Sequence, residues 1–386
     1  MTHVKSDSIL TKSQCDILRG LAIIGIFLHN FCHWLHGSNK ENEYTFLLDR
    51  SNKMWHYWTD GGIDQFFPIQ FFSFFGHYGV PLFLFLSGYG LVMKYEHNGA
   101  ARVKALSFIG YHWLKLFRLM ILGYILSVLT YEVWCGFEPH AWNEVVAQLT
   151  LIVNLIFREP GGALLPGPYW FFGLMIEVYI IYRLLIYPSH DKPKSVWRWL
   201  IPMLLILVSW IVMATQEKHT VNLNYLRYNA AVAMLPFSMG ILMARYGMPK
   251  LSKLTLAVIA VVSIPAMAVF NLNYQSWLWT PVVVIAGAVA FVLLFDSSSR
   301  QASGVVMKPL AWTGAMSSFI FVAHSIPRMP MFKFVLWGQS KLMLTDYFWF
   351  LAYIVLTLVL AWLYKQYLKL IPSPRLKGGK TITFSR

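Results

Sequence analysis

Charge is what this sequence has least of. Only 13% of its 386 residues are charged and 57% are hydrophobic, whereas about 25% of the residues of an ordinary soluble domain are charged. Apolar runs of roughly 20 residues recur along the whole chain. This combination excludes a soluble globular domain and predicts an all-α polytopic membrane protein.

Cysteine is scarce as well. Cys15, Cys32 and Cys135 are scattered and form no C-x-x-C pair, which argues against a disulfide framework or a structural zinc site. We find no low-complexity segment and no internal repeat of the kind that builds many transporters. The polar N-terminus precedes a long apolar segment without a small-residue cleavage site, so we expect that segment to remain as a span.

The apolar runs predict about ten transmembrane helices, each near the ~20 residues that a bilayer requires. They lie at about 17–36, 71–93, 112–133, 168–188, 197–215, 227–245, 253–271, 278–295, 309–327 and 346–367.

Positive charge sets the expected orientation, because cytoplasmic loops retain lysine and arginine. The segments 94–118 and 183–198 are both basic, so both should face the cytoplasm. An even number of crossings must then join these two segments. The spans at 112–133 and 168–188 already provide two, so the apolar stretch 141–157 between them is expected to be a re-entrant or interfacial segment. N- and C-termini are expected to be cytoplasmic, with short tails at about 1–16 and 370–386.

The net charge of +15 therefore has a topological explanation. It suits anionic lipid headgroups or a phosphorylated cytoplasmic ligand, and nucleic acid is not needed to account for it. No long loop is large enough for a soluble appendage. We expect residues 1–386 to form a single membrane-embedded domain with no soluble appended domain.

Ionisable residues within spans are functional candidates, since burial of charge in a bilayer costs at least ~2.5 kcal/mol. Arg19 opens the first span and is compatible with a simple topology anchor. His29 lies ~15 Å deeper, where anchoring does not explain it. Its imidazole is suited to proton abstraction or to a structural hydrogen bond between helices. His33 and Cys32 lie near His29, but no carboxylate accompanies them in the span, so we expect no metal.

Other candidates occur along the chain. Glu177 is the only carboxylate placed inside a span, where it is compatible with orienting a histidine, binding a substrate hydroxyl, proton transport or helix packing. His77 and Ser87 lie at opposite ends of the second span, and His324 lies late in the chain. Lys115 and Arg118 share one helix face, as topology anchors or as a phosphate-binding pair with Arg19.

Several segments together resemble the membrane acyltransferase 3 family of multi-spanning O-acyltransferases. They occur in the family's order over nearly the whole chain: "ILRGLAIIGIFLHNF", "FFGHYGVPLFLFLSGYGLV", "KLFR", "YWFFGLMIEVYIIY", "LPFSMGILMARYG" and "SSFIFVAHSIP".

The resemblance implies transfer of an acyl group, often acetyl, from cytoplasmic acyl-CoA to a hydroxyl of a glycan or lipid-linked sugar. Arg19 and His29 match the signature of the first span, and Ser87 and Gly88 match the SG pair of the second. The remaining matches are Lys115 and Arg118 for the basic pair, Trp170 and Glu177 for the aromatic-acid motif, and His324 for the late histidine.

One spacing departs from the family pattern, which usually has ten residues between the arginine and the histidine. Here nine residues separate Arg19 from His29, and ten helical steps fall about 80° short of a common face. Either the helix is distorted, the two groups need not share a face, or the assignment of partners is imperfect.

These observations predict an acetyl-CoA-dependent O-acetyltransferase of the bacterial inner membrane. We expect His29, Arg19 and Glu177 to be catalytic, and Arg19, Lys115, Arg118 and Ser87 to bind acyl-CoA. Trp170, His77 and His324 are expected to contact the acceptor. The alternative is a proton-coupled secondary transporter that uses His29, Glu177 and His324 as a relay, and a non-catalytic scaffold is a further one.

Overall fold

The first helix begins directly after a capping box, earlier than the expected start of the first span at about residue 17. The Thr11 side chain accepts a hydrogen bond from the Gln14 N–H at 3.2 Å, and the Gln14 side chain accepts one from the Thr11 N–H at 2.7 Å. This capping box satisfies two otherwise unpaired helix donors. Helix α1 (Lys12–Cys32) then continues for 21 residues, which is long enough to cross a bilayer.

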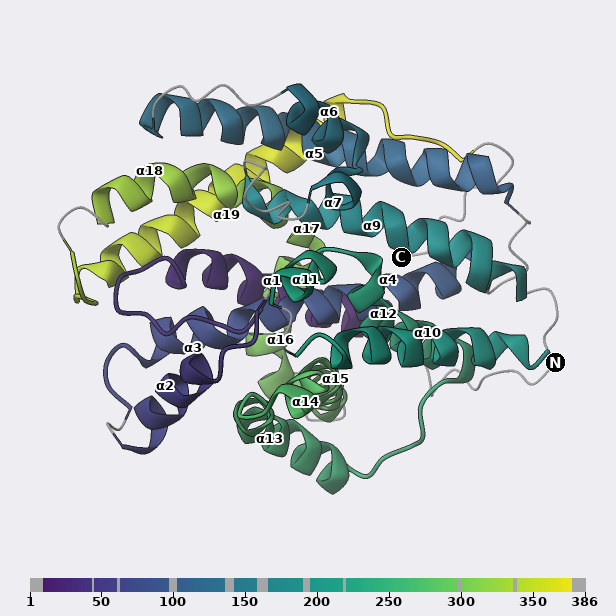
Figure 1. Ribbon diagram of the computed structural model, residues 1–386, viewed down its shortest axis with the longest axis horizontal. Coiled ribbons are helices and arrows are strands. Elements are labelled where there is room, and N and C mark those ends of the chain that lie inside the picture. Colours follow the sequence, from purple (N-terminus) through teal and green to yellow (C-terminus); the bar gives the residue numbers. More distant parts are fainter. Residues whose placement is uncertain are drawn as a thin grey trace.

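In this computed structural model (Figure 1), the described residues are 10–43, 45–60, 63–96, 103–135, 142–157, 166–189, 195–217, 220–296, 300–335 and 339–376. They contain helices and no strand. The expected tails at 1–16 and 370–386, and the Cys135 side chain, lie wholly or partly outside them.

The remaining helices alternate long apolar segments with short connecting ones. Their bounds are α2 (Leu48–Thr59), α3 (Phe67–Phe75), α4 (Gly79–Tyr95), α5 (Ala105–Cys135), α6 (Trp142–Thr150), α7 (Val153–Ile156), α9 (Trp170–Ile181), α10 (Trp197–Ala214), α11 (Thr220–Arg227), α12 (Ala230–Tyr246), α13 (Lys253–Phe270), α14 (Tyr274–Trp277), α15 (Thr280–Asp296), α16 (Arg300–Ala315), α17 (Ser317–Ala323), α18 (Ser325–Val335) and α19 (Asp346–Leu370).

The prediction of an all-α polytopic membrane protein is confirmed. Among the described residues, eight helical segments are long and apolar enough to cross a membrane: 12–32, 67–95, 105–134, 167–186, 197–214, 222–246, 253–270 and 346–370.

The two other expected spans differ from the prediction of ten simple crossings. The segment expected at 309–327 is broken into α16 and α17–α18, bent by 63°, with Gly314 before the break and the serine pair Ser317–Ser318 after it. Such residues often accompany sharp kinks. The helix expected at 278–295 is α15, with 17 residues, and falls short of the length of the others.

The stretch 142–157 does not form one long helix. It divides into α6 and α7, and Leu151 between them has φ +62°, a conformation that an L-residue rarely adopts. This arrangement agrees with the expectation that the stretch does not cross the membrane.

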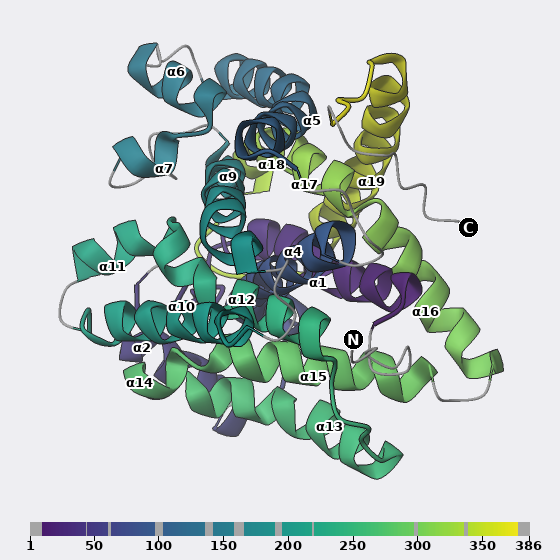
Figure 2. The same ribbon diagram turned by 90° about the vertical axis from the view of Figure 1, so that its right-hand side faces the viewer.

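The long helices differ in how much of their surface the protein covers. In α1 and in the α3–α4 segment, 67% and 72% of the apolar window is buried, compared with 17% in α10 and α13. Figure 2 shows α1 and α4 in the interior, with α5, α10, α13 and α19 toward the periphery. The peripheral helices therefore present apolar faces suited to lipid.

Glycines allow the interior helices to approach closely. A Cβ on Gly88 of α4 would lie 2.1 Å from the Phe237 carbonyl oxygen, and a Cβ on Gly240 of α12 would lie 1.9 Å from the Phe85 carbonyl oxygen. At one end of this pair, Glu96 and Arg245 form a buried salt bridge of 2.8 Å. Close packing through small residues is a general means of associating helices in lipid, where the hydrophobic effect contributes little.

Two of the three glycines in α4, Gly88 and Gly90, provide a matched test of this packing. We expect Gly88→Ala to destabilise the protein by about 1–3 kcal/mol, because the new methyl group would overlap the α12 backbone. Gly90→Ala should be neutral or slightly stabilising, since no atom lies within 4 Å of a Cβ there and alanine favours helix. Thermal unfolding of both purified variants measures the difference. Equal melting temperatures would contradict the packing role of Gly88.

Candidate functional site

A large cavity lies between α1, α4, α5, α9, α17 and the end of α19. Its volume is about 900 Å³, and Arg19, Ser87, Lys115 and Arg118 all line it. These are the four residues that the sequence predicted to bind acyl-CoA, and the fold brings them to one space. Lys365 and Lys369 of α19 add further positive charge to its wall.

Arg118, Arg19 and Lys115, three basic residues of the large cavity, have different hydrogen-bond and ion-pair partners. The Arg118 Nη2 donates to the carbonyl oxygens of Leu368 and Ile371 at the end of α19, so this guanidinium ties α5 to the chain that follows α19. The Arg19 Nη1 binds the Asp16 carboxylate at 2.7 Å. Lys115 forms no ion pair with any residue that the structure describes, which makes its ammonium the better placed of the three for an anionic ligand.

A smaller space, which we call the histidine chamber, lies beyond the large cavity. It has a volume of about 170 Å³ and is lined by polar groups that include His29, Glu43 and His77. Ile26, Phe171 and Phe321 line both spaces. The large cavity and the histidine chamber therefore adjoin at an apolar constriction that these side chains close, because the centroids of the Phe171 and Phe321 rings are only 5.4 Å apart.

His29 is fixed by backbone acceptors on α3. Its Nδ1 lies 3.0 Å from the Ser73 carbonyl oxygen and 3.3 Å from that of Phe72. A neutral ring that donates from Nδ1 leaves the lone pair of Nε2 available. The Nε2 atom lies 3.7 Å from the Glu43 carboxylate, so this nitrogen faces an anion that would stabilise its protonated form.

Two glycines make this contact possible. A Cβ on Gly76 would lie 2.5 Å from the Gly25 carbonyl oxygen and 2.7 Å from the His29 Cβ. Only residues without a side chain allow α1 and the turn after α3 to approach so closely. The glycines beside His29 thus determine which carbonyl groups its ring can reach.

The loop that carries Glu43 is held from several sides. The Asn39 N–H donates to Gln70 Oε1 at 2.7 Å, and Ser73 Oγ donates to the Asn39 carbonyl at 2.7 Å. Asn42 Nδ2 donates to Ser51 Oγ at 2.7 Å. These bonds fix the loop between α1 and α2 before any ligand is bound.

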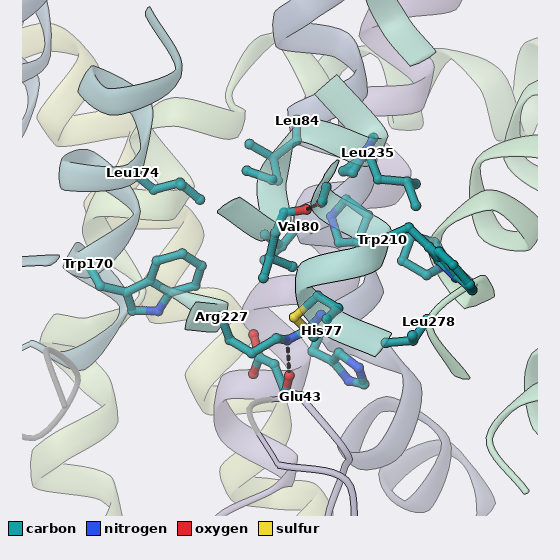
Figure 3. Close-up of a pocket in the computed structure, with 17 residues that line it drawn as sticks. Glu43, His77, Val80, Leu84, Trp170, Leu174, Trp210, Arg227, Leu235 and Leu278 are labelled. Carbon is teal, nitrogen blue, oxygen red and sulfur yellow. Dashed lines mark hydrogen bonds between the residues drawn. The ribbon is translucent and has the colours of Figure 1, made fainter. Parts of the chain in front are cut away.

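Arginines hold the backbone of this loop. Arg50 donates to the Glu41 carbonyl at 2.6 Å, and Arg227 donates to the Glu43 carbonyl; Figure 3 shows the second of these contacts. Burial lowers the pKa of the neighbouring Lys40 from its ordinary value, and the Glu41 carboxylate opposes that shift. Among the described residues, Glu41, Glu43 and His29 offer ligand atoms that all lie within 4.8 Å of one another.

Two more histidine rings border His29. The His33 ring stacks on it at 4.5 Å, and the His77 ring lies 5.6 Å away. His77 is 2% exposed, and neither of its ring nitrogens has a hydrogen-bond partner among the described residues. Trp170 completes this wall, so His77 and Trp170, two of the three predicted acceptor contacts, line the chamber.

A side pocket of about 60 Å³ shares Glu43, His77, Val80 and Trp170 with the histidine chamber. Its remaining wall is mostly apolar and comes from α4, α10 and α12. Figure 3 shows Trp210, Leu235 and Leu278 on the side opposite Trp170. The pocket extends from the polar groups near His29 into an apolar region between helices.

Two predicted site residues have different surroundings. One Glu177 oxygen accepts the Ala230 N–H at 2.9 Å at the start of α12, where a carboxylate complements a helix N-terminus. His324 is fully buried and its Nδ1 lies 2.6 Å from the Phe321 carbonyl oxygen. Neither residue lines the large cavity or the histidine chamber.

Three charged residues of the chamber were not predicted from the sequence. Glu41 and Glu43 belong to a polar loop, and Arg328 follows His324 by one helical turn. Arg328 is 5% exposed and donates to Asn30 Oδ1 at 2.9 Å. The only signal available for the two acids was their position shortly after the first span.

The short spacing between Arg19 and His29 has a structural explanation. Arg19 lines the large cavity and His29 lines the histidine chamber, so the two groups need not share a helix face. Helix α1 runs without interruption between them, and a distortion is not required.

Fold and cavities together define a polytopic membrane protein with two adjoining spaces in its helical interior, each lined in part by polar groups. Residues 13–366 match the family model Acyl_transf_3, described as an acyltransferase domain. The chain therefore belongs to the membrane acyltransferase 3 family, as its motifs indicated, and is an acyltransferase. No curated protein and no solved structure matches it.

The tethered loop gives a prediction that does not depend on activity. Gln70→Leu should remove two hydrogen bonds, to the Asn39 N–H and the Gly37 carbonyl, each worth about 1 kcal/mol. Hydrogen exchange followed by mass spectrometry should then be several-fold faster in peptides that cover 37–43. The exposed Gln275→Leu is the control. Unchanged exchange in Gln70→Leu would show that the loop is held by other contacts.

Proposed function

We propose that this protein transfers an acyl group, most simply acetyl, from cytoplasmic acyl-CoA to a hydroxyl of an extracytoplasmic glycan or lipid-linked sugar. The observation that carries the proposal is the meeting of the two spaces at Ile26, Phe171 and Phe321. One side offers basic groups for a phosphorylated donor, and the other offers a positioned imidazole.

The donor would enter the large cavity from the cytoplasm. Lys115 and Arg19 are placed for the phosphates of CoA, because clustered cations bind phosphate oxygens strongly. The pantetheine arm would pass along Ser87 toward the constriction. This places the thioester near Phe171 and Phe321, within reach of the histidine chamber.

His29 is assigned the role of general base. Its Nε2 would take the proton of the acceptor hydroxyl as the oxygen attacks the thioester carbonyl carbon. The C–S bond then breaks, CoA leaves as the thiolate, and the imidazolium returns the proton to sulfur. The products are an O-acyl ester and free CoA.

Glu43 is assigned the role of stabilising the imidazolium. Its carboxylate is 3.7 Å from Nε2, whereas Glu177 contacts the start of α12. Glu177, which was predicted from the sequence to be catalytic, is thus better explained as the group that fixes the position of α12. Trp170 and His77 remain the proposed acceptor contacts, and His324 is proposed to support the chamber through the Phe321 backbone.

The acceptor would approach from the side opposite the large cavity. The histidine chamber lies next to the loop between α1 and α2, and the side pocket adds an apolar wall next to it. Such a combination suits a sugar hydroxyl with a lipid carrier nearby. We infer a bacterial inner-membrane location from this arrangement of donor and acceptor sides.

The proposed base gives a direct prediction. His29→Gln should lower acyl transfer about 10²–10⁴-fold, because general base catalysis contributes in that range, and Glu43→Gln should lower kcat with a smaller effect. The measurement follows label from acetyl-CoA into host membrane acceptors with purified protein. His56→Gln, which alters an exposed histidine paired with Asp60 at 2.6 Å, is the control. Near wild-type turnover in His29→Gln would exclude the assignment.

The donor site gives a second prediction. Lys115→Met should raise the KM for acetyl-CoA about 10-fold while kcat changes little, because a charge-assisted contact of about 1.5 kcal/mol is lost. A CoA analogue that lacks the 3′-phosphate shows whether that phosphate is the group recognised. Lys53→Met, at an exposed i,i+4 ion pair, should leave KM unchanged. An unaltered KM in Lys115→Met would remove Lys115 from the donor site.

A further inference from the structure

The group formed by His29, Glu41 and Glu43 has the composition of a cation site. It supplies one imidazole nitrogen and two carboxylate oxygens, with all three ligand atoms within 4.8 Å of one another. No carboxylate lies within two turns of His29 on α1, where Asp16 is the only acid, and no metal was therefore expected from the sequence. The loop after α1 supplies two carboxylates, those of Glu41 and Glu43.

The charge of the group matches a divalent cation. Among the described residues, His29 is the only ion-pair partner of Glu43, and Glu41 has none. Three of the nearby cations, Arg50, Arg227 and Lys40, donate to backbone carbonyl oxygens, and Arg328 donates to the Asn30 side chain. Two carboxylates this close in a partly buried site repel each other, and a bound dication would remove that repulsion.

Unpartnered polar atoms point to a missing ligand at the same place. The Glu41 Oε2 is buried without a hydrogen bond, and both His77 ring nitrogens are also without one. His77 is 98% buried (2% exposed) and lines the chamber that contains His29 and both acids. Buried polar groups are nearly always satisfied, so several orphaned atoms facing one chamber call for a specific explanation.

The surroundings are already organised as they are around bound metals. The second ring nitrogen of His29 contacts the Ser73 carbonyl at 3.0 Å, which is the usual outer contact of a metal-bound histidine. The loop with both acids is fixed by Gln70, Ser73 and Ser51. Little ordering would therefore be needed when a cation binds.

We propose that His29, Glu41 and Glu43 bind a divalent cation of the Zn²⁺ type, with His77 placed as a further ligand or as the partner of a bound water. One nitrogen and two oxygen ligands suit Zn²⁺ better than Ca²⁺ or Mg²⁺, which prefer all-oxygen sites. The cation occupies the Nε2 lone pair of His29. If the proposed function is correct, bound metal and base catalysis by His29 exclude each other, and the cation acts as an inhibitor.

Metal binding is tested on the full-length protein in detergent, without any acyl donor or acceptor. Calorimetric titration with Zn²⁺ should show one saturable site, weakened more than about 10-fold in His29→Gln, Glu41→Gln and Glu43→Gln. The controls are His56→Gln and Glu217→Gln, which change exposed residues and should bind like wild type. Absence of saturable binding, or equal binding in all five variants, overturns the proposal.

A measurement on the wild-type protein covers variants that fail to fold. X-ray absorption of the Zn²⁺-loaded protein should show nitrogen and oxygen ligands at about 2.0–2.2 Å. A sulfur ligand at about 2.3 Å would place the metal on a cysteine and overturn the site.

Activity separates this proposal from the proposed function. Inhibition of acyl transfer by Zn²⁺ that a chelator reverses is expected if both hold. Zn²⁺ binding at these residues without any acyl transfer would support the site and contradict the enzyme mechanism. Acyl transfer that depends on His29, in a protein that does not bind Zn²⁺, would support the enzyme mechanism and contradict the metal site.

Discussion

The contact between α1 and the turn that follows α3 is the constraint on which the polar interior depends. Gly25 and Gly76 let two backbones meet so closely that the His29 ring reaches the Ser73 carbonyl at 3.0 Å. An imidazole in an apolar helix would otherwise lose its hydrogen bonds to water without replacement. The same approach directs Nε2 away from α3 and toward the loop that carries Glu43. Helix packing and the chemistry of the site thus have one origin.

The rest of the interior separates two environments around that point. Toward one end, Arg19, Lys115 and the lysines of α19 surround a wide cavity. Toward the other, His29 and two acids enclose a narrow chamber. The ring pair of Phe171 and Phe321 stands between them and closes the constriction, so these rings must move apart before a molecule can reach from one space into the other.

Arg118 and Glu177 show how a residue can match a family motif and have a mainly structural contact. The Arg118 guanidinium binds carbonyl oxygens at the end of α19, and Glu177 binds the first N–H group of α12. Both satisfy backbone groups that a helix end leaves unpaired. In a membrane interior such groups cost several kcal/mol if nothing binds them. The contacts of Arg118 and Glu177 therefore show how helix ends are held in place, and they do not by themselves indicate a catalytic role.

The sequence alone determined the class of fold, most of the helix positions and the acyltransferase family, and it singled out Arg19, His29 and Lys115, which the fold places on the walls of the two spaces. Hydropathy and span length carry that information locally, because each helix satisfies its own backbone in lipid. The sequence could not determine the 63° bend after α16, which depends on packing, or the partner of His29. Glu43 lies in a polar loop whose path is decided by Gln70, Ser73 and Arg227, residues distant in the chain. Only the tertiary structure brings that carboxylate to the imidazole, because the contact is made between segments that share no periodicity.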